Sequence, residues 1–155
     1  MYQIKQLDAQ NTAQIIAFDK LCFPTDFWKE EDWQDLLRDK RAAYYALLDS
    51  DNIVGDVFIY NWQGEKDYVK IMNIAVHPNY RNQGLASRLL NHAAKEMERL
   101  GMFRFCGETR ASNRAMQKVF TNCGYALNKV EENYYHNPEE SARKYVLQGE
   151  KTGLS

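Results

Sequence analysis

The sequence has no excess of charge of either sign. Its 155 residues include 20 Lys and Arg against 21 Asp and Glu, which gives a formal net charge of -1. Binding to nucleic acid or to anionic membranes usually requires a basic surface, and the near balance of charge excludes a general one. We therefore expect neither nucleic acid nor a membrane as a partner, and any affinity for an anion has to be local.

Cysteine is scarce and long apolar runs are missing. Cys22, Cys106 and Cys123 are an odd number without paired spacing, which argues against a disulfide framework. We expect all three to be small core residues rather than nucleophiles, as free cysteines usually are. No run of about 18 apolar residues and no signal peptide is present. We therefore expect a cytoplasmic protein with reduced thiols, and we expect no bound metal.

The length and the hydrophobic pattern predict one domain, residues 1–147, followed by a polar tail, residues 148–155. No internal repeat and no linker is visible. Periodicity predicts the order β-α-α-β-β-β-α-β-α-β-β, an α/β domain with a mixed, mostly antiparallel sheet flanked by helices. The expected strands are 2–7, 42–48, 52–62, 68–76, 102–109, 125–130 and 144–147. The expected helices run from about residue 12 to before Phe23, and over 30–38, 84–100 and 112–122.

A turn joins the strand that ends at Val76 to the helix that starts near Gly84. Unpaired N–H groups and the positive end of the helix dipole make such a start suitable for a phosphate. Gly84 and Ala86 leave room for it, and Arg81 and Arg88 add cations, although the sequence does not say which arginine meets a phosphate. Taken alone, the turn is explained as well by a plain strand-to-helix connection. The dinucleotide fingerprint and the P-loop both match poorly.

Further motifs that follow this turn in the sequence support a role for it in binding a ligand. The segment Asn73–Leu90, followed by Glu108–Asn113 and Asn122–Tyr125, closely resembles the GNAT acetyltransferase superfamily, and within it the RimI-type N-terminal acetyltransferases of ribosomal proteins. The likeness runs from about Met72 to Tyr125 and includes Asn133–Tyr135. It implies a GNAT-like domain that uses acetyl-CoA as co-substrate and transfers acetyl to a primary amine by direct attack in a ternary complex.

The resemblance also implies where acetyl-CoA binds. Its pyrophosphate is expected on backbone amides of the Arg81–Ala86 motif and the residue after it, and its pantetheine arm along the main chain of a splayed strand, where an N–H can polarise the thioester carbonyl. The residues implied for the pyrophosphate are Asn82, Gln83, Gly84, Leu85, Ala86 and Ser87, and those for the pantetheine arm are Ile74, Ala75 and Val76. Asn113 matches an asparagine that hydrogen-bonds the cofactor, and it could equally cap the helix that follows.

Glu108 matches the general base of the family. The alternative is a surface carboxylate paired with Arg104 or Arg110. A protein α-amine has a reference pKa near 8 and a lysine amine one near 10.4, so a weak carboxylate base favours the α-amine mildly.

The sequence departs from the family at Phe120, where RimI-type enzymes place a tyrosine as general acid. A phenyl ring cannot donate a proton, although a thiolate with a pKa near 8.5 leaves tolerably without help. Tyr125, Tyr134, Tyr135 and His136 are conceivable replacements, and the sequence leaves the acid unassigned. Phe120 also motivates an alternative function, a catalytically weakened acetyl-CoA-binding module.

The acceptor is indicated by Tyr134 and Tyr135. This pair resembles the loop between the last two strands of the family, where such tyrosines bind the backbone of a peptide's first residues. It implies that the acceptor is a protein N-terminal α-amine, and a small-molecule amine remains the alternative. Phe23, Pro24 and Trp28 would form the opposite wall of the acceptor groove, or simply pack as aromatic and apolar residues.

Overall fold

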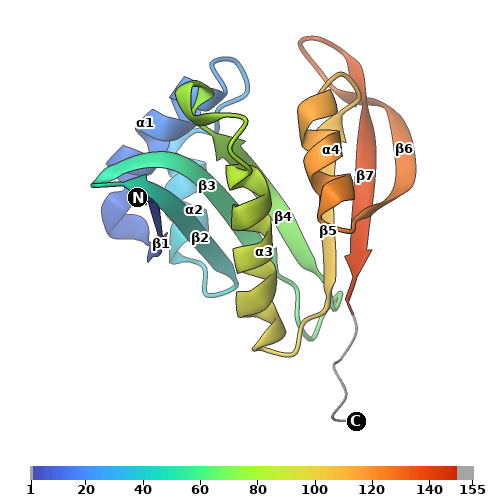
Figure 1. The fold of residues 1–155 in the computed structure, drawn as a ribbon, viewed down its shortest axis with the longest axis horizontal. Helices are drawn as coiled ribbons and strands as arrows, with labels where there is room; N and C mark the ends of the chain where they lie inside the picture. Colours follow the sequence, from blue (N-terminus) through green and yellow to red (C-terminus); the bar gives the residue numbers. More distant parts are fainter. Residues whose placement is uncertain (1, 150–155) are drawn as a thin grey trace. The chain divides into compact units, whose positions relative to one another are not determined.

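The computed structural model describes residues 2–149, and the rest of the predicted tail, 150–155, lies outside the described residues. The strands are β1 (Tyr2–Leu7), β2 (Ala42–Asp49), β3 (Asn52–Asn61), β4 (Val69–Val76), β5 (Arg104–Arg110), β6 (Ala126–Tyr135) and β7 (Glu140–Gln148), and the helices are α1 (Thr12–Cys22), α2 (Glu30–Arg38), α3 (Leu85–Glu98) and α4 (Arg114–Asn122) (Figure 1). Two short 3-10 turns, η1 (Ala9–Asn11) and η2 (Pro78–Tyr80), complete the order. The predicted order of strands and helices is confirmed.

The strands of the described chain form one sheet in the order β1-β2-β3-β4-β5-β7-β6. Neighbouring strands run antiparallel in the pairs β1–β2, β2–β3, β5–β7 and β6–β7. The pair β4–β5 runs parallel. A parallel pair needs a crossover connection, which α3 supplies between these two strands. The predicted α/β class with a mixed, mostly antiparallel sheet is therefore confirmed.

The chain divides into two compact units that share β4 and α3. The first unit comprises the residues up to Tyr60 together with Met72–Ala93, and the second comprises Asn61–Ile71 and the residues from Ala94 onward. The first three residues of β4 therefore belong to the second unit, and the rest of this strand belongs to the first.

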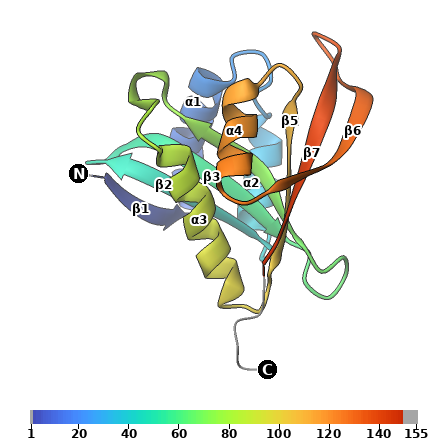
Figure 2. The same ribbon diagram turned by 45° about the vertical axis from the view of Figure 1, so that its right-hand side comes forward.

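In the first unit, helices cover both faces of the strands. Figures 1 and 2 show α1 and α2 behind β1–β3 and α3 in front of them. Tyr44 and Tyr45 are neighbours on β2, so their side chains point to opposite faces. The Tyr44 ring meets Trp33 of α2, at 5.9 Å between centroids, and the Tyr45 ring meets His92 of α3, at 5.0 Å.

A buried carboxylate organises the segment between α1 and α2. Asp19 is 2% exposed, and one of its oxygens accepts hydrogen bonds from the Trp28 N–H, at 2.8 Å, and from the Trp33 indole, at 3.0 Å. The two indole rings lie 4.7 Å apart and both pack on Phe58. Trp28 therefore packs against the core of this unit, as the aromatic-packing interpretation expects.

In the second unit, α4 covers one face of β5 and β7. Phe120 of α4 is buried and stacks on Tyr145 of β7 at 5.2 Å between ring centroids. A Cβ atom added to Gly107 of β5 would lie only 2.5 Å from the tip of the Phe120 ring, so only glycine allows this contact. Because side chains alternate along a strand, Glu108 and Lys144, which lie directly opposite each other, face away from α4.

The last two strands are longer than predicted. β6 covers Ala126–Tyr135 rather than 125–130, and β7 covers Glu140–Gln148 rather than 144–147. β6 is an edge strand on which most residues are exposed. Polar residues therefore occupy both of its faces, and the alternation of apolar residues that marks a half-buried strand is missing.

Candidate functional site

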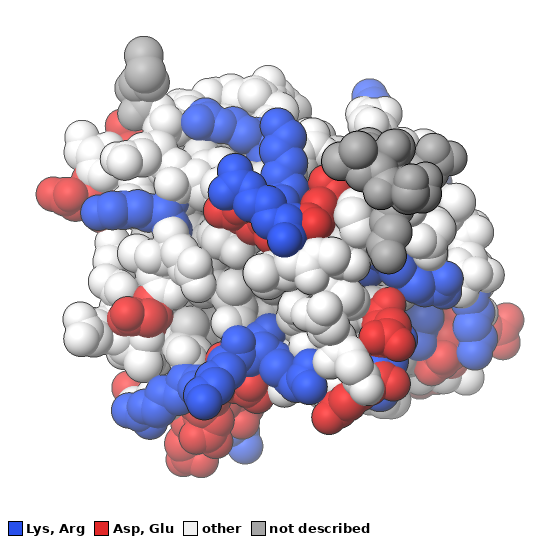
Figure 3. All heavy atoms as spheres, turned by 90° about the horizontal axis from the view of Figure 1, so that it is seen from below, with Lys and Arg blue, Asp and Glu red and all other residues white. Residues whose placement is uncertain are grey.

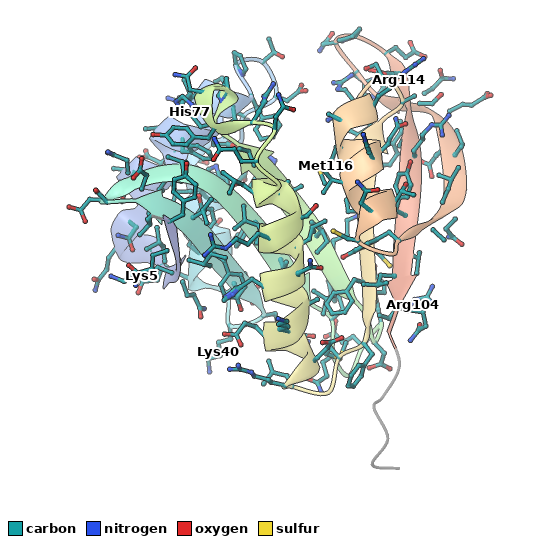
Figure 4. All side chains as sticks on the ribbon, viewed as in Figure 1. Lys5, Lys40, His77, Arg104, Arg114 and Met116 are labelled. Atoms are coloured by element: carbon teal, nitrogen blue, oxygen red, sulfur yellow. The ribbon has the colours of Figure 1, made fainter. Side chains whose placement is uncertain are left out.

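The turn before α3 belongs to the first unit and begins at His77, labelled in Figure 4. The His77 N–H donates to the Val54 carbonyl at 2.8 Å, which ties the end of β4 to β3. Asn82 and Gly84 have positive φ angles of 65° and 71°. Backbone that alternates between left-handed and right-handed conformations turns successive N–H groups toward one side and forms an anion-binding nest.

The first turn of α3 presents free backbone donors. The Arg88 N–H makes a helical bond to the Gly84 carbonyl, at 3.1 Å, so the amides just before Arg88 have no carbonyl four residues back within the helix. No acidic residue lies in this turn, and no atom of the described chain beyond the adjacent residues lies within 4 Å of a Cβ built on Gly84. This arrangement is suited to a phosphate group.

The two arginines near the turn differ in their surroundings. An Arg88 guanidinium nitrogen donates to the carbonyl of Tyr2 at 3.3 Å, and the Tyr2 hydroxyl donates to the Gln83 side chain at 3.0 Å. Arg81 is exposed. Arg88 is thus held against β1, and Arg81 is the more freely placed cation beside the turn.

The main chain at the end of β4 has two edges. The main-chain groups of Ala75 point toward β3. Its N–H lies close to the buried carboxylate of Asp56 on β3 and favours the ionised form of that carboxylate. Its carbonyl oxygen lies 3.3 Å from a Cβ built on Gly55, which also belongs to β3. Successive residues of a strand direct their N–H and C=O groups to opposite edges. Ile74 and Val76 therefore direct theirs away from β3.

Glu108 lies on β5 in the second unit, and its side chain is 13% exposed. It forms a hydrogen-bonded ion pair with Lys70 of β4, whose side chain is 27% exposed. The expected alternative, a surface carboxylate paired with Arg104 or Arg110, is wrong: the carboxylate is mostly buried and its cation is Lys70. Arg110 instead pairs with Glu140 at 3.5 Å.

Tyr134 is the second partner of Glu108. It lies beside the Glu108 carboxylate, and hydrogen bonding to this carboxylate together with burial raises the pKa of Tyr134. The ammonium of Lys144 lies 4.6 Å from the centre of the Tyr134 ring and donates to Glu131 at 3.1 Å. Lys70, Glu108, Tyr134, Lys144 and Glu131 thus form one polar cluster, here called the Glu108 cluster.

The expectation that Tyr134 and Tyr135 lie in a loop is wrong. Both belong to the end of β6, and Tyr135 pairs with Glu140 across the last turn. Their rings meet edge to face at 5.1 Å, and the guanidinium of Arg110 lies 4.7 Å from the Tyr135 ring centre. The structure therefore brings Tyr134 to Glu108 and places Tyr135 against Arg110.

Phe120 and Asn113 lie at the two ends of α4. Asn113 accepts a hydrogen bond from the Met116 N–H at 3.1 Å, so it caps the helix, as the alternative interpretation expects. Figure 4 places Arg114 and Met116 on this helix. Phe120 contacts Tyr125 at 4.9 Å between ring centroids. The Tyr125 hydroxyl is buried without a hydrogen-bond partner among the described residues, and burial raises its pKa.

Sequence reasoning missed Lys70. Its strand was predicted from a run of apolar residues, Tyr68–Val76, and Lys70 is the one charged residue in that run. A lysine within an otherwise apolar strand requires a partner for its charge. The presence of this lysine in an apolar strand indicates that it has an acidic partner, but the sequence does not identify Glu108 as that partner.

Metal and membrane signals are both missing from the described part of the chain. Within residues 2–149, no three His, Cys, Asp or Glu side chains gather as metal ligands would. None of the helices found there combines the length and the apolar character that spanning a bilayer requires. The face in Figure 3 carries Lys and Arg side by side with Asp and Glu, in line with the small net charge.

The curated relatives point to acetyl transfer. The chain is similar to the ribosomal protein bS18-alanine N-acetyltransferase of Escherichia coli (strain K12), with 38% identity over 69 residues, 44% of this chain and 47% of that protein. The chain thus spans about half the length of this relative. The resemblance to RimI-type enzymes is confirmed at this level.

Solved structures share the fold over the whole chain. The crystal structure of the ribosomal-protein-S18-alanine N-acetyltransferase from Escherichia coli has a TM-score of 0.87 at 24% identity, covering 100% of this chain and 98% of that one. Arabidopsis thaliana NAA60 in complex with acetyl-CoA has a TM-score of 0.83 at 14% identity, covering 94% and 97%. The family model described as the acetyltransferase (GNAT) family matches residues 8–125. The chain therefore belongs to the GNAT acetyltransferase family.

Proposed function

We propose that the protein transfers the acetyl group of acetyl-CoA to a primary amine, foremost the α-amine of a protein N-terminus, by direct attack in a ternary complex. The observation that carries this proposal is Glu108, a mostly buried carboxylate held by Lys70 and by the Tyr134 hydroxyl. The name of the Escherichia coli relative, an alanine N-acetyltransferase of a ribosomal protein, supports a protein acceptor. We further propose that the protein acts in the cytoplasm.

Binding of acetyl-CoA is assigned to two segments of the first unit. The backbone amides from Asn82 to Ser87 hold the pyrophosphate, and the exposed cation Arg81 adds charge beside them. Ile74 and Val76 pair with the pantetheine arm, because their main-chain groups point away from β3. The polar groups of Ala75 serve β3 instead. Asn113 already caps α4 through its side-chain oxygen, which leaves its amide nitrogen for the cofactor.

Proton transfer is assigned to Glu108. An amine must lose a proton before or as it attacks, and Glu108 receives that proton directly or through a water. Tyr134 lies beside this carboxylate and belongs to the surface on which the acceptor lies. Acetyl-CoA, when bound, supplies the activated carbonyl and a thiolate leaving group.

The test is a panel of acceptors incubated with acetyl-CoA, from peptides with free N-termini to polyamines, aminoglycosides and amino acids. We expect turnover of peptides, and we expect Glu108→Gln to lower kcat by about 10² to 10⁴. Glu131→Gln is the matched control, because Glu131 belongs to the same cluster and bonds Lys144 rather than Glu108. Turnover restricted to small amines would contradict the protein acceptor, and equal kcat for the two variants would contradict the role of Glu108.

A further inference from the structure

We propose that Lys70 is itself an acetyl acceptor, so that the protein acetylates its own β4 strand at this residue. The proposal rests on the proposed function, because it uses the same acetyl-CoA and the same base. The amine of Lys70 already contacts the Glu108 carboxylate. An acceptor amine has to meet the same carboxylate, so Lys70 already makes the contact with the base that an acceptor needs.

The direction of the Lys70 side chain supports this role. In the parallel pairing of β4 with β5, Lys70 lies directly opposite Cys106. Its amine nevertheless contacts Glu108, two residues further along β5. The side chain therefore leans toward the carboxyl ends of both strands. Along β4, that is also the direction of Ile74 and Val76, to which the pantetheine arm is assigned.

The environment of Lys70 differs from that of the other lysines in the Glu108 cluster and beside it. Lys144 lies directly opposite Glu108 in the β5–β7 register, and its side chain is 30% exposed, close to the 27% of Lys70. Its amine, however, donates to Glu131 at 3.1 Å. Lys129 is 62% exposed and also pairs with Glu131, at 3.6 Å. Of these three lysines, Lys70 is thus the one whose amine contacts Glu108, whereas the amines of Lys144 and Lys129 contact Glu131.

The chemistry balances without any further reactant. A bond forms between the Lys70 nitrogen and the acetyl carbon, and the bond between that carbon and the CoA sulfur breaks. The ammonium loses two protons, of which one passes to solvent through Glu108 and the other ends on the CoA sulfur. Since lysine amines are almost fully protonated at neutral pH, we expect the reaction to be slow and to accelerate as the pH rises.

The experiment follows the intact mass of the full-length protein incubated with acetyl-CoA, with peptide mapping of the modified residue. We expect one added acetyl group, located on Lys70, at a first-order rate that does not change when the protein is diluted. Lys70→Arg keeps the positive charge and should lose the modification. The matched variant Lys144→Arg should keep it, and Glu108→Gln should slow it by about 10² or more.

Chemical acetylation by acetyl-CoA is measured on the same protein unfolded in urea. Acetyl groups spread over several lysines at the rate of the unfolded chain would overturn the proposal, as would labelling of Lys70 that is unaffected by Glu108→Gln in a variant with an unchanged melting temperature. Peptide turnover without acetylation of Lys70 would overturn this inference alone. A protein that acetylates neither itself nor any amine of the panel would overturn the proposed function as well.

Discussion

Asp56 is a buried acidic residue of the first unit in surroundings that disfavour its charge. It is 1% exposed, and one carboxylate oxygen accepts a hydrogen bond from the Tyr44 hydroxyl at 2.6 Å while the other has no partner in the described chain. Burial raises the pKa of this carboxyl to about 7, and the nearby Asp19 charge adds to the effect. Cys22 lies close enough for the same carboxylate to raise the pKa of its thiol.

The raised pKa makes folding depend on pH. An aspartate in the unfolded chain has a pKa near 3.9, so the folded state binds this proton more tightly. The stability that the protonated form contributes is fully present below about pH 4 and is lost as the pH rises through about 7. A difference of about three units corresponds to about 4 kcal/mol, of which relaxation and water entry remove a part.

We expect Asp56→Asn to abolish this dependence. The amide is neutral at every pH and its oxygen can still accept from Tyr44, so the variant should be more stable than the natural protein at about pH 8, by about 2 kcal/mol, and equal to it at about pH 4. Urea unfolding at both pH values measures the difference. Asp49→Asn, at the half-exposed end of β2, serves as control. An equal pH slope in Asp56→Asn and in the natural protein would show that the carboxyl does not titrate in this range.

At the scale of the element, α3 is bounded by two comparable glycines. Gly84 has a φ of 71° and precedes its first residue, and Gly101 has a φ of 86° and lies just beyond its last turn. Among residues 2–149, no atom beyond the adjacent residues lies within 4 Å of a Cβ built on either one. Alanine therefore meets no clash at these positions and suffers only the strain of a left-handed backbone, about 1 to 2 kcal/mol.

Because the two glycines are alike in conformation and surroundings, alanine variants of both distinguish an effect on stability from an effect on ligand binding. We expect Gly84→Ala and Gly101→Ala to lose similar free energies of unfolding, but only Gly84→Ala to weaken acetyl-CoA binding, by about tenfold, because its methyl group enters the space proposed for the pyrophosphate. Calorimetric titration with acetyl-CoA gives the affinities, and urea unfolding gives the stabilities. Similar affinities for the two variants would place the pyrophosphate elsewhere.

The elements that could be predicted from the sequence are those with a buried face. β2, β3 and α3 carry apolar residues at the spacing of their own periodicity, so their positions agree with the prediction within one or two residues. β6 carries charges on both faces and was predicted too short. Because Tyr134 lies at the unrecognised end of β6, its bond to Glu108 could not be predicted either. Glu108 itself was found through its motif, whereas Lys70 belongs to no motif.

At the scale of the whole molecule, the two compact units interleave along the chain. The boundaries fall after Tyr60, after Ile71 and after Ala93, near the end of β3, inside β4 and inside α3. Linkers between domains are recognised by a shift in composition or by flexible, polar segments. A boundary that falls inside a strand or a helix has no such segment. This is why the sequence indicated one domain without revealing the division.

Acetyl-CoA should stabilise the molecule as a whole. A ligand that binds only the folded state adds about 2.7 kcal/mol at 100 times its dissociation constant, which for a domain of this size is a melting shift of several degrees. Thermal melts with acetyl-CoA, with CoA and with acetate measure it, and we expect the first two to stabilise and acetate to have no effect. Equal melting temperatures in all three would contradict the assigned co-substrate.

The half-buried cysteines have a practical consequence for measuring the reaction. Burial raises the pKa of Cys22 to about 12, and it also raises the pKa of Cys106. Thiol reagents attack the thiolate, so these two side chains should react slowly, while the thiol of free CoA is fully exposed to solvent and reacts quickly. A colorimetric thiol reagent can therefore follow the release of CoA continuously in the presence of the protein, with little background from either cysteine.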